Sequence, residues 1–112
     1  MQILVEEERV TEAKDLGIPE LIDLLGKVAI TGINYESKNK EVQIIDQNNP
    51  STKWDVTVTP GNTTLCLARN KVTTKINLNA VSSISHLTNM RVIIIETKAG
   101  ISFHLYYILG RA

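Results

Sequence analysis

The chain has 112 residues, 43% of them hydrophobic and 21% charged, and its 12 basic and 12 acidic side chains give a formal net charge of zero. This length and composition are typical of one globular domain and argue against a disordered chain. The single cysteine, Cys66, excludes an internal disulfide and with it the disulfide-stapled class of secreted domains. Because Cys66 lies between two leucines, we expect it to be a buried small hydrophobe.

The charges are distributed unevenly along the chain. Residues 1–26 hold seven acidic and two basic side chains, whereas residues 57–112 hold six basic and one acidic. Asymmetry of this kind indicates an anionic partner or an acidic tail. The longest uninterrupted apolar run is Val92–Ile95, far short of a membrane-spanning helix, and the N-terminus has no basic leader. We therefore expect a cytoplasmic protein.

The N-terminal part predicts an acidic segment over residues 1–17 and a short helix over residues 18–26. Within the acidic segment, residues 3–5 could form a strand and residues 10–16 a loop or a helical turn. The helix is indicated by a proline in its first turn, an apolar stripe and Gly26 at its end. Two turns of helix are not stable alone, so we expect this one to pack against the end of a β-barrel.

From residue 27 onward the hydrophobic period becomes two, which predicts strands. β-Branched residues make up 34 of the 112, and turn signals recur at short intervals. Three hairpins are expected, joining residues 28–33 to 41–45, 65–68 to 71–79, and 91–97 to 101–108, with a further strand at Trp54, Val56 and Val58. The predicted fold class is α+β and mainly β, a single domain over residues 1–112. Its β-rich core, residues 27–112, forms a small barrel or sandwich of six to eight mostly antiparallel strands.

The second hairpin provides the best candidate binding surface. Alternation predicts that Arg69, Lys71 and Lys75 share one outward face, with Thr73 and Asn77 as hydrogen-bond donors between them. Such mixtures of basic and small polar side chains hold phosphate groups. If three phosphates are contacted, the logarithm of the binding constant should fall with the logarithm of salt concentration with a slope of roughly −2 to −3. The alternative is a solvated face that discourages edge-to-edge aggregation.

Two residues of the last strand complete the candidate site. In residues 101–108, alternation directs His104 and Tyr106 outward, and Tyr106 is the one exposed aromatic side chain we expect to be available for stacking on a base. The predicted partner is anionic, with RNA or DNA ahead of lipid headgroups. A rival hypothesis is a protein partner or a homodimer formed through an exposed strand edge. The run Val92–Ile95 fits either a central strand or half of such an interface.

No motif for catalysis or metal binding is present. His86 and His104 lack a ligand-spaced partner, and one cysteine cannot form a Cys-x-x-Cys site. Nucleophile-elbow, phosphate-loop and dinucleotide-binding patterns are also missing. We therefore expect both histidines to face solvent, no metal, no cofactor and no catalytic residues. The expected function is that of a non-catalytic regulatory or adaptor module, whose acidic N-terminus is either a solubilising tail or a segment that lies across the basic face.

Three segments resemble the strand rhythm of pleckstrin-homology and GRAM-like domains. They are Thr64-Leu-Cys-Leu-Ala-Arg-Asn-Lys-Val, Thr74-Lys-Ile-Asn-Leu-Asn-Ala-Val-Ser-Ser-Ile-Ser and Val92-Ile-Ile-Ile-Glu-Thr-Lys-Ala-Gly-Ile-Ser-Phe. The resemblance implies a small β-barrel, although the C-terminal helix of that family has no counterpart here. In the first half, Gly26-Lys-Val-Ala-Ile-Thr-Gly-Ile and Trp54-Asp-Val-Thr-Val-Thr-Pro are similar to small accessory proteins of Gram-positive conjugative elements. Neither resemblance assigns a binding residue.

Overall fold

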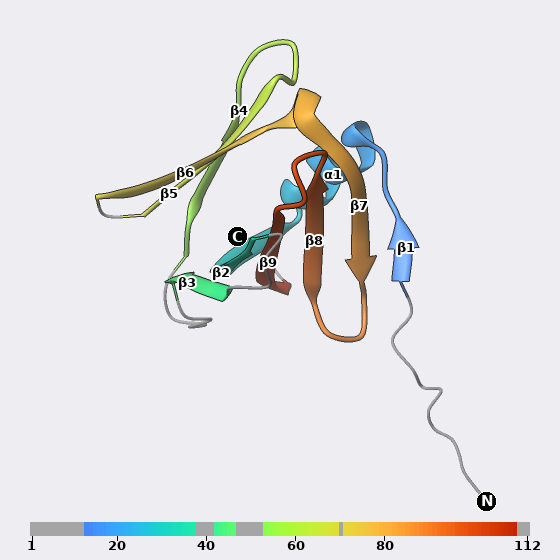
Figure 1. The fold of residues 1–112 in the computed structure, drawn as a ribbon. Helices are drawn as coiled ribbons and strands as arrows, with labels where there is room; N and C mark the ends of the chain where they lie inside the picture. Colours follow the sequence, from blue (N-terminus) through green and yellow to red (C-terminus); the bar gives the residue numbers. More distant parts are fainter. Residues whose placement is uncertain (1–12, 38–41, 47–52, 70, 110–112) are drawn as a thin grey trace, which may run out of the picture.

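The computed structural model describes residues 13–37, 42–46, 53–69 and 71–109. Their elements are, in chain order, β1 (Ala13–Asp15), α1 (Ile18–Leu25), β2 (Val28–Glu36), β3 (Val42–Asp46), β4 (Asp55–Val58), β5 (Thr64–Arg69), β6 (Val72–Asn77), the 3-10 helix η1 (Leu78–Ala80), β7 (Val81–Leu87), β8 (Val92–Thr97) and β9 (Ser102–Leu109). This mainly β chain with one α-helix confirms the predicted fold class (Figure 1).

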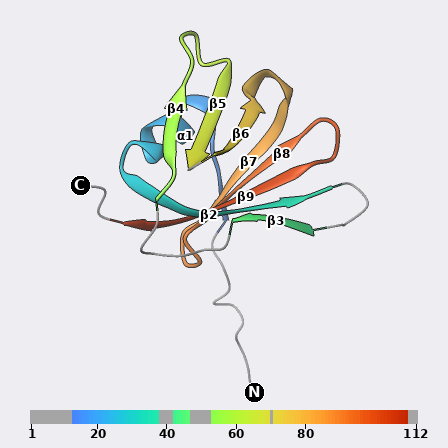
Figure 2. The same ribbon diagram turned by 90° about the vertical axis from the view of Figure 1, so that its left-hand side faces the viewer.

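The strands form two antiparallel sheets. The larger has the order β1-β7-β8-β9-β2-β3 and the smaller the order β4-β5-β6. Figure 2 shows the smaller sheet and α1 on the same side of the larger sheet, so the arrangement is sandwich-like. The two sheets are joined by η1, which leads from β6 into β7, and by a hydrogen bond of 2.9 Å from the Trp54 backbone N–H to the Ile30 carbonyl oxygen.

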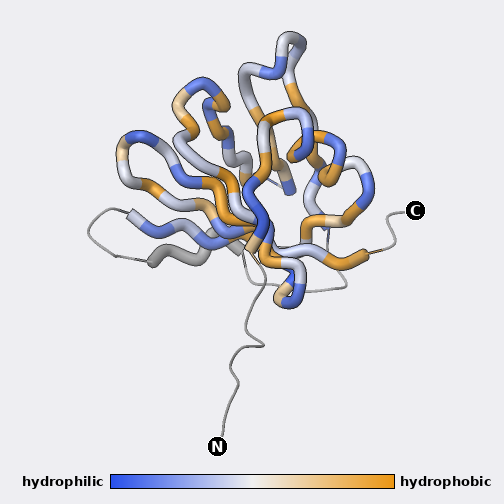
Figure 3. Tube along the Cα trace, turned by 90° about the vertical axis from the view of Figure 1, so that its right-hand side faces the viewer, coloured by the Kyte–Doolittle hydropathy of each residue, from blue (hydrophilic) through white to orange (hydrophobic). Residues whose placement is uncertain are grey.

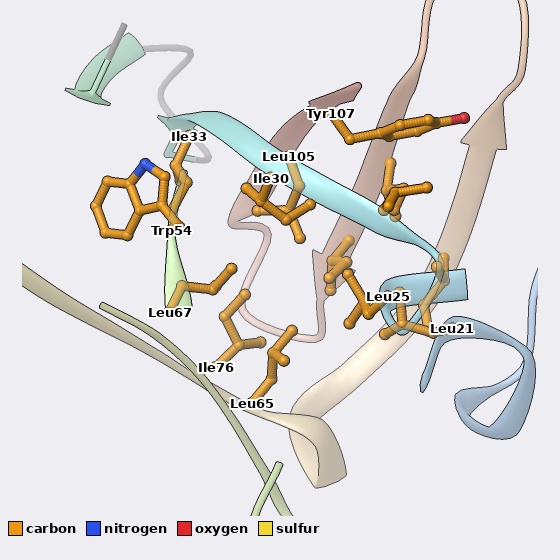
Figure 4. Close-up of a cluster of buried hydrophobic side chains, with 14 of the residues drawn as sticks. Leu21, Leu25, Ile30, Ile33, Trp54, Leu65, Leu67, Ile76, Leu105 and Tyr107 are labelled. Carbon is orange, nitrogen blue, oxygen red and sulfur yellow. The ribbon is translucent and has the colours of Figure 1, made fainter. Parts of the chain in front are cut away.

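The core lies between the two sheets. In Figure 4 the side chains of Leu65, Leu67 and Ile76 from the smaller sheet point toward Ile30 and Leu105 of the larger sheet, and all five are at most 1% exposed. Figure 3 shows the same pattern along the chain, with hydrophobic segments converging in the middle and hydrophilic ones at the turns. Alternating apolar residues thus bury one face of each strand, as the period of two predicts.

Helix α1 closes one end of this core. Its first turn contains a proline, and the Gly17 backbone N–H donates a hydrogen bond of 3.1 Å to the side chain of Glu20. At its other end the Gly26 N–H donates to the Ile22 carbonyl oxygen at 3.2 Å. Leu21 and Leu25 are buried among the core side chains (Figure 4). The predicted helix and its packing against the strands are therefore confirmed.

The N-terminal segment differs from the prediction. Residues 13–15 form neither a loop nor a helical turn but the short strand β1, which pairs with β7 through Ala13 and Leu87. They therefore lie at an edge of the larger sheet and not on the β5–β6 hairpin. The strand expected at residues 3–5 lies outside the described residues, as does most of the acidic segment.

Two further strands complete the comparison with the sequence. Strand β7 lies outside the three predicted hairpins, because a register irregularity between Val81 and Ser83 interrupts its alternation. Strand β8 contains the run Val92–Ile95 and lies between β7 and β9. The interpretation of this run as a central strand is therefore confirmed.

Candidate nucleic-acid interface

The β5–β6 hairpin holds the candidate basic residues. Residues 64–77, which build it, include three basic side chains and no acidic one. The two strands pair antiparallel, with Thr64 opposite Asn77 and Arg69 opposite Val72. Side chains directly opposite one another lie on the same face of a sheet. This register therefore decides which candidate residues lie together.

Thr73 and Lys75 of β6 are exposed on the side of the hairpin that faces away from the core, and Lys71 is exposed in the turn just before β6. The neighbouring residue Ile76 is 1% exposed and points into the core, so the predicted alternation of β6 is confirmed. We call the surface formed by Lys71, Thr73 and Lys75 the basic face. Lysine ammonium groups separated by a hydroxyl suit phosphate oxygens, which accept hydrogen bonds from both.

Two residues of the neighbouring strands border the basic face. Cys66, opposite Lys75 on β5, is half-buried on this outward side and does not lie in the core, contrary to prediction. Asp55 of β4 is exposed. It is opposite Ala68 of β5, which in turn is opposite Thr73 of β6. The one carboxylate in the strands of the smaller sheet therefore lies at the opposite edge of that sheet from β6.

Arg69 does not belong to the basic face. It is opposite Val72, and both lie on the side of Leu67 and Ile76, so the prediction that Arg69 shares a face with the two lysines is wrong. Because Arg69 is opposite Val72, odd-numbered residues of β5 share a face with even-numbered residues of β6. Arg69 is half-buried near the end of the hairpin, whose Val72 is 45% exposed.

Asn77 is exposed at the end of β6 but already has a structural role. Its side-chain oxygen accepts a hydrogen bond of 2.9 Å from the Asn79 backbone N–H and so caps η1. Asparagine at such a position satisfies a backbone donor that the short helix leaves unpaired. Its side-chain oxygen is thereby engaged, and only the amide N–H groups remain to serve a ligand.

His104 and Tyr106 are not close to the basic face. Both point away from the core on β9, as predicted, but β9 belongs to the larger sheet, whose outward face lies on the far side of the core (Figure 2). Both are half-buried, and the Tyr106 hydroxyl accepts a hydrogen bond of 3.2 Å from the Asn34 side chain. The structure thus divides the predicted site between two opposite surfaces.

A histidine–tyrosine pair was missed by sequence reasoning. The His86 Nε2 and the Tyr107 hydroxyl are 2.5 Å apart, and the two rings are tilted at 48°. Burial lowers the pKa of His86, and the positive charge of Lys14, opposite it on β1, lowers this pKa further. Burial also raises the pKa of Tyr107, against a smaller opposing effect of Arg91. His86 is half-buried on the core side of β7, so the expectation that it faces solvent is wrong.

His86 should make the stability of the fold depend on pH. Because its pKa is lower in the folded than in the unfolded chain, the unfolded chain binds more protons between these two pKa values. The free energy of unfolding should therefore fall as the pH drops through the unfolded value of about 6.5. Urea unfolding at pH 7.5 and pH 5.5 should show a smaller loss for His86→Gln than for the unaltered chain, and equal losses would contradict the prediction.

The described part of the chain offers neither a metal site nor a pocket. No group of three or more His, Cys, Asp or Glu side chains is placed there to hold a metal ion. No pocket opens among the same residues. None of the described helices has the length and apolar character needed to cross a membrane. The basic face is therefore the candidate functional site of this protein.

Comparison of the whole chain with known protein families, with curated proteins and with solved structures finds no match.

Proposed function

We propose that this protein is a small, non-catalytic, cytoplasmic regulatory module that binds duplex DNA through the β5–β6 hairpin. The observation that supports the proposal best is the basic face itself, in which Thr73 and Lys75 are exposed along β6 and Lys71 is exposed in the turn just before this strand. No acidic side chain is present in either strand of the hairpin. A phosphate backbone approaching this surface meets two positive charges and a hydroxyl donor.

The groove dimensions of nucleic acids favour duplex DNA among the anionic partners. The basic face belongs to the β4-β5-β6 sheet, and its side chains can reach into the wide major groove of B-DNA, whereas that of an RNA helix is too narrow for side chains to read. Arg69 is half-buried on the core side of the hairpin, so the charge of the candidate surface comes from the two lysines. No aromatic residue occurs in residues 64–77, which argues against a stacking surface for single strands.

The salt dependence of DNA binding tests this proposal. We expect the unaltered protein to bind a fluorescently labelled 20-base-pair duplex, with a log–log salt slope steeper by about 2 than that of the Lys71→Ala, Lys75→Ala variant. The variant should also lose affinity about tenfold or more at low salt. Fluorescence anisotropy over a series of salt concentrations measures both quantities.

A matched control removes the same charge elsewhere. Lys27 is paired with Asp23 at 3.0 Å beside α1, and Lys98 lies in the β8–β9 turn. The Lys27→Ala, Lys98→Ala variant should keep the slope of the unaltered protein. If both double variants lose the same slope, the attraction comes from overall charge and the assignment to the basic face is wrong. Preferential binding to vesicles containing phosphatidylserine would favour a lipid ligand instead and would also contradict the proposal.

A further inference from the structure

Strand β6 is the last strand of the smaller sheet, and its outer edge has no neighbouring strand in the described part of the chain. The Leu78 N–H donates a hydrogen bond of 2.9 Å to the Thr63 carbonyl oxygen. Thr63 and Leu78 therefore form a hydrogen-bonded pair that continues the β5–β6 register. Since hydrogen-bonded and non-hydrogen-bonded pairs alternate in an antiparallel ladder, the backbone groups of Thr74 and Ile76 face β5. Those of Thr73 and Lys75 therefore face the open edge.

The other side of β5 supports this assignment independently. The Thr59 N–H donates to the Thr64 carbonyl oxygen at 3.0 Å and extends the β4–β5 register. The backbone groups of Thr64 and Cys66 thus face β4, and those of Leu65 face β6. Both ladders agree, so β6 presents regularly spaced donors and acceptors along its free edge. An edge of this kind is a template for another strand.

We propose that two copies of this chain pair through β6, antiparallel, about a two-fold axis at Thr74. Thr73 would then form a hydrogen-bonded pair with Lys75 of the partner subunit, and Lys75 with Thr73 of the partner subunit. Thr74 would lie opposite its own copy as a non-hydrogen-bonded pair. The two three-stranded sheets become one continuous sheet of six strands. This interface rests on the backbone edge and does not depend on DNA binding.

Side-chain charges disfavour two neighbouring registers. Moving the axis to Thr73 would place Lys71 directly opposite Lys75 of the partner subunit, and moving it to Lys75 would place Lys75 opposite its own copy. Like charges directly opposite one another destabilise a strand pair. With the axis at Thr74, each Lys75 faces a threonine and each Lys71 aligns with Asn77 of the partner subunit.

The same register provides an apolar neighbour for Val72. This residue is 45% exposed in the single chain, an unusual environment for a valine on the core side of a strand. In the dimer it lies beside Ile76 of the partner subunit, and an aliphatic pair in this position stabilises the ladder. The contact occurs twice because the two-fold axis relates the subunits.

Charge substitutions at Thr73 test the interface by sedimentation equilibrium of the full chain. Thr73→Lys places a positive charge opposite Lys75 of the partner subunit in two symmetric pairs, so we expect the dimer dissociation constant to rise about 3- to 30-fold. Thr73→Glu should lower it by a similar factor. Thr57→Lys makes the same change on the same outward side of the sheet but on β4, where the dissociation constant should not change.

Cross-linking tests the register. Non-hydrogen-bonded pairs have Cα atoms about 4.5 Å apart, which a disulfide can bridge. In a Cys66→Ser background, Thr74→Cys should therefore form a covalent dimer under mild oxidation, whereas Thr73→Cys should not. Circular dichroism of each variant confirms that the chain is folded. Comparable cross-linking at both positions would overturn the register.

The dimer itself is overturned if the unaltered chain and Thr73→Glu both sediment as monomers at millimolar concentration. It is also overturned if Thr73→Lys and Thr57→Lys change the dissociation constant equally. The same variant distinguishes failure of the dimer from failure of DNA binding, because Thr73→Lys adds a positive charge to the basic face. That variant should bind DNA more tightly while dimerising more weakly, so the two measurements move in opposite directions.

Discussion

Replacing Leu21 by alanine is expected to lower the free energy of unfolding by about 3–5 kcal/mol. Leu21 is fully buried, and its side chain belongs to the cluster in which α1 meets the strands (Figure 4). The substitution removes apolar contacts and leaves a cavity at the closed end of the core. Domains of this size have a total stability of about 5–15 kcal/mol, so the loss is a large part of it. Urea unfolding followed by circular dichroism measures the change.

Leu109→Ala is the matched control for Leu21→Ala. Leu109 lies at the end of β9 and is 57% exposed, so the same chemical change should alter the free energy of unfolding by no more than about 0.5 kcal/mol. Equal losses for the two variants would show that α1 does not close the core in the way that the structure indicates.

Replacing Trp54 by alanine should cost about 3–5 kcal/mol. Trp54 is 3% exposed, immediately precedes β4 and packs near Ile33 and Leu67 at the other end of the core from α1 (Figure 4). Its backbone N–H bond to Ile30 persists in the variant, so the loss measures the contribution of the side chain. Since Trp54 is the single tryptophan, unfolding of this variant is followed by circular dichroism and not by tryptophan fluorescence.

Trp54→Phe separates packing from the indole N–H. Within the described residues the buried Trp54 Nε1 has no hydrogen-bond partner. An unpaired buried donor costs about 1–3 kcal/mol, and phenylalanine removes it while keeping an aromatic ring. We therefore expect Trp54→Phe to be clearly more stable than Trp54→Ala. A loss as large as that of alanine would indicate that the indole N–H is paired in solution.

Local pattern was sufficient to predict most of the elements. Helix α1 is defined by a proline in its first turn, an apolar stripe and Gly26, all within nine residues. Most strands show their alternation directly, because apolar side chains in a half-buried strand recur at every second position. Strand β7 was left out of the predicted hairpins because its irregular register breaks that period, and its pairing with β8 and β1 is what defines it.

The candidate site was only partly predictable. Thr73 and Lys75 belong to one strand, so alternation alone places them on one face, and Lys71 lies in the turn just before this strand. Arg69 was misplaced because its face depends on the number of residues in the turn, which sets the register of β5 against β6. His104 and Tyr106 were correctly directed outward, but no local pattern shows that β9 and β6 belong to different sheets.

The charge asymmetry shows the same division between sequence and fold. Counting residues along the chain is enough to locate an excess of basic side chains in the second half, because charge is a property of composition. The pairing of strands distributes those side chains over different surfaces, with Lys71 and Lys75 on the basic face and Arg69 on the opposite side of the hairpin. The contact between His86 and Tyr107 likewise joins strands 21 positions apart, so only the register of the folded sheet brings these two side chains together.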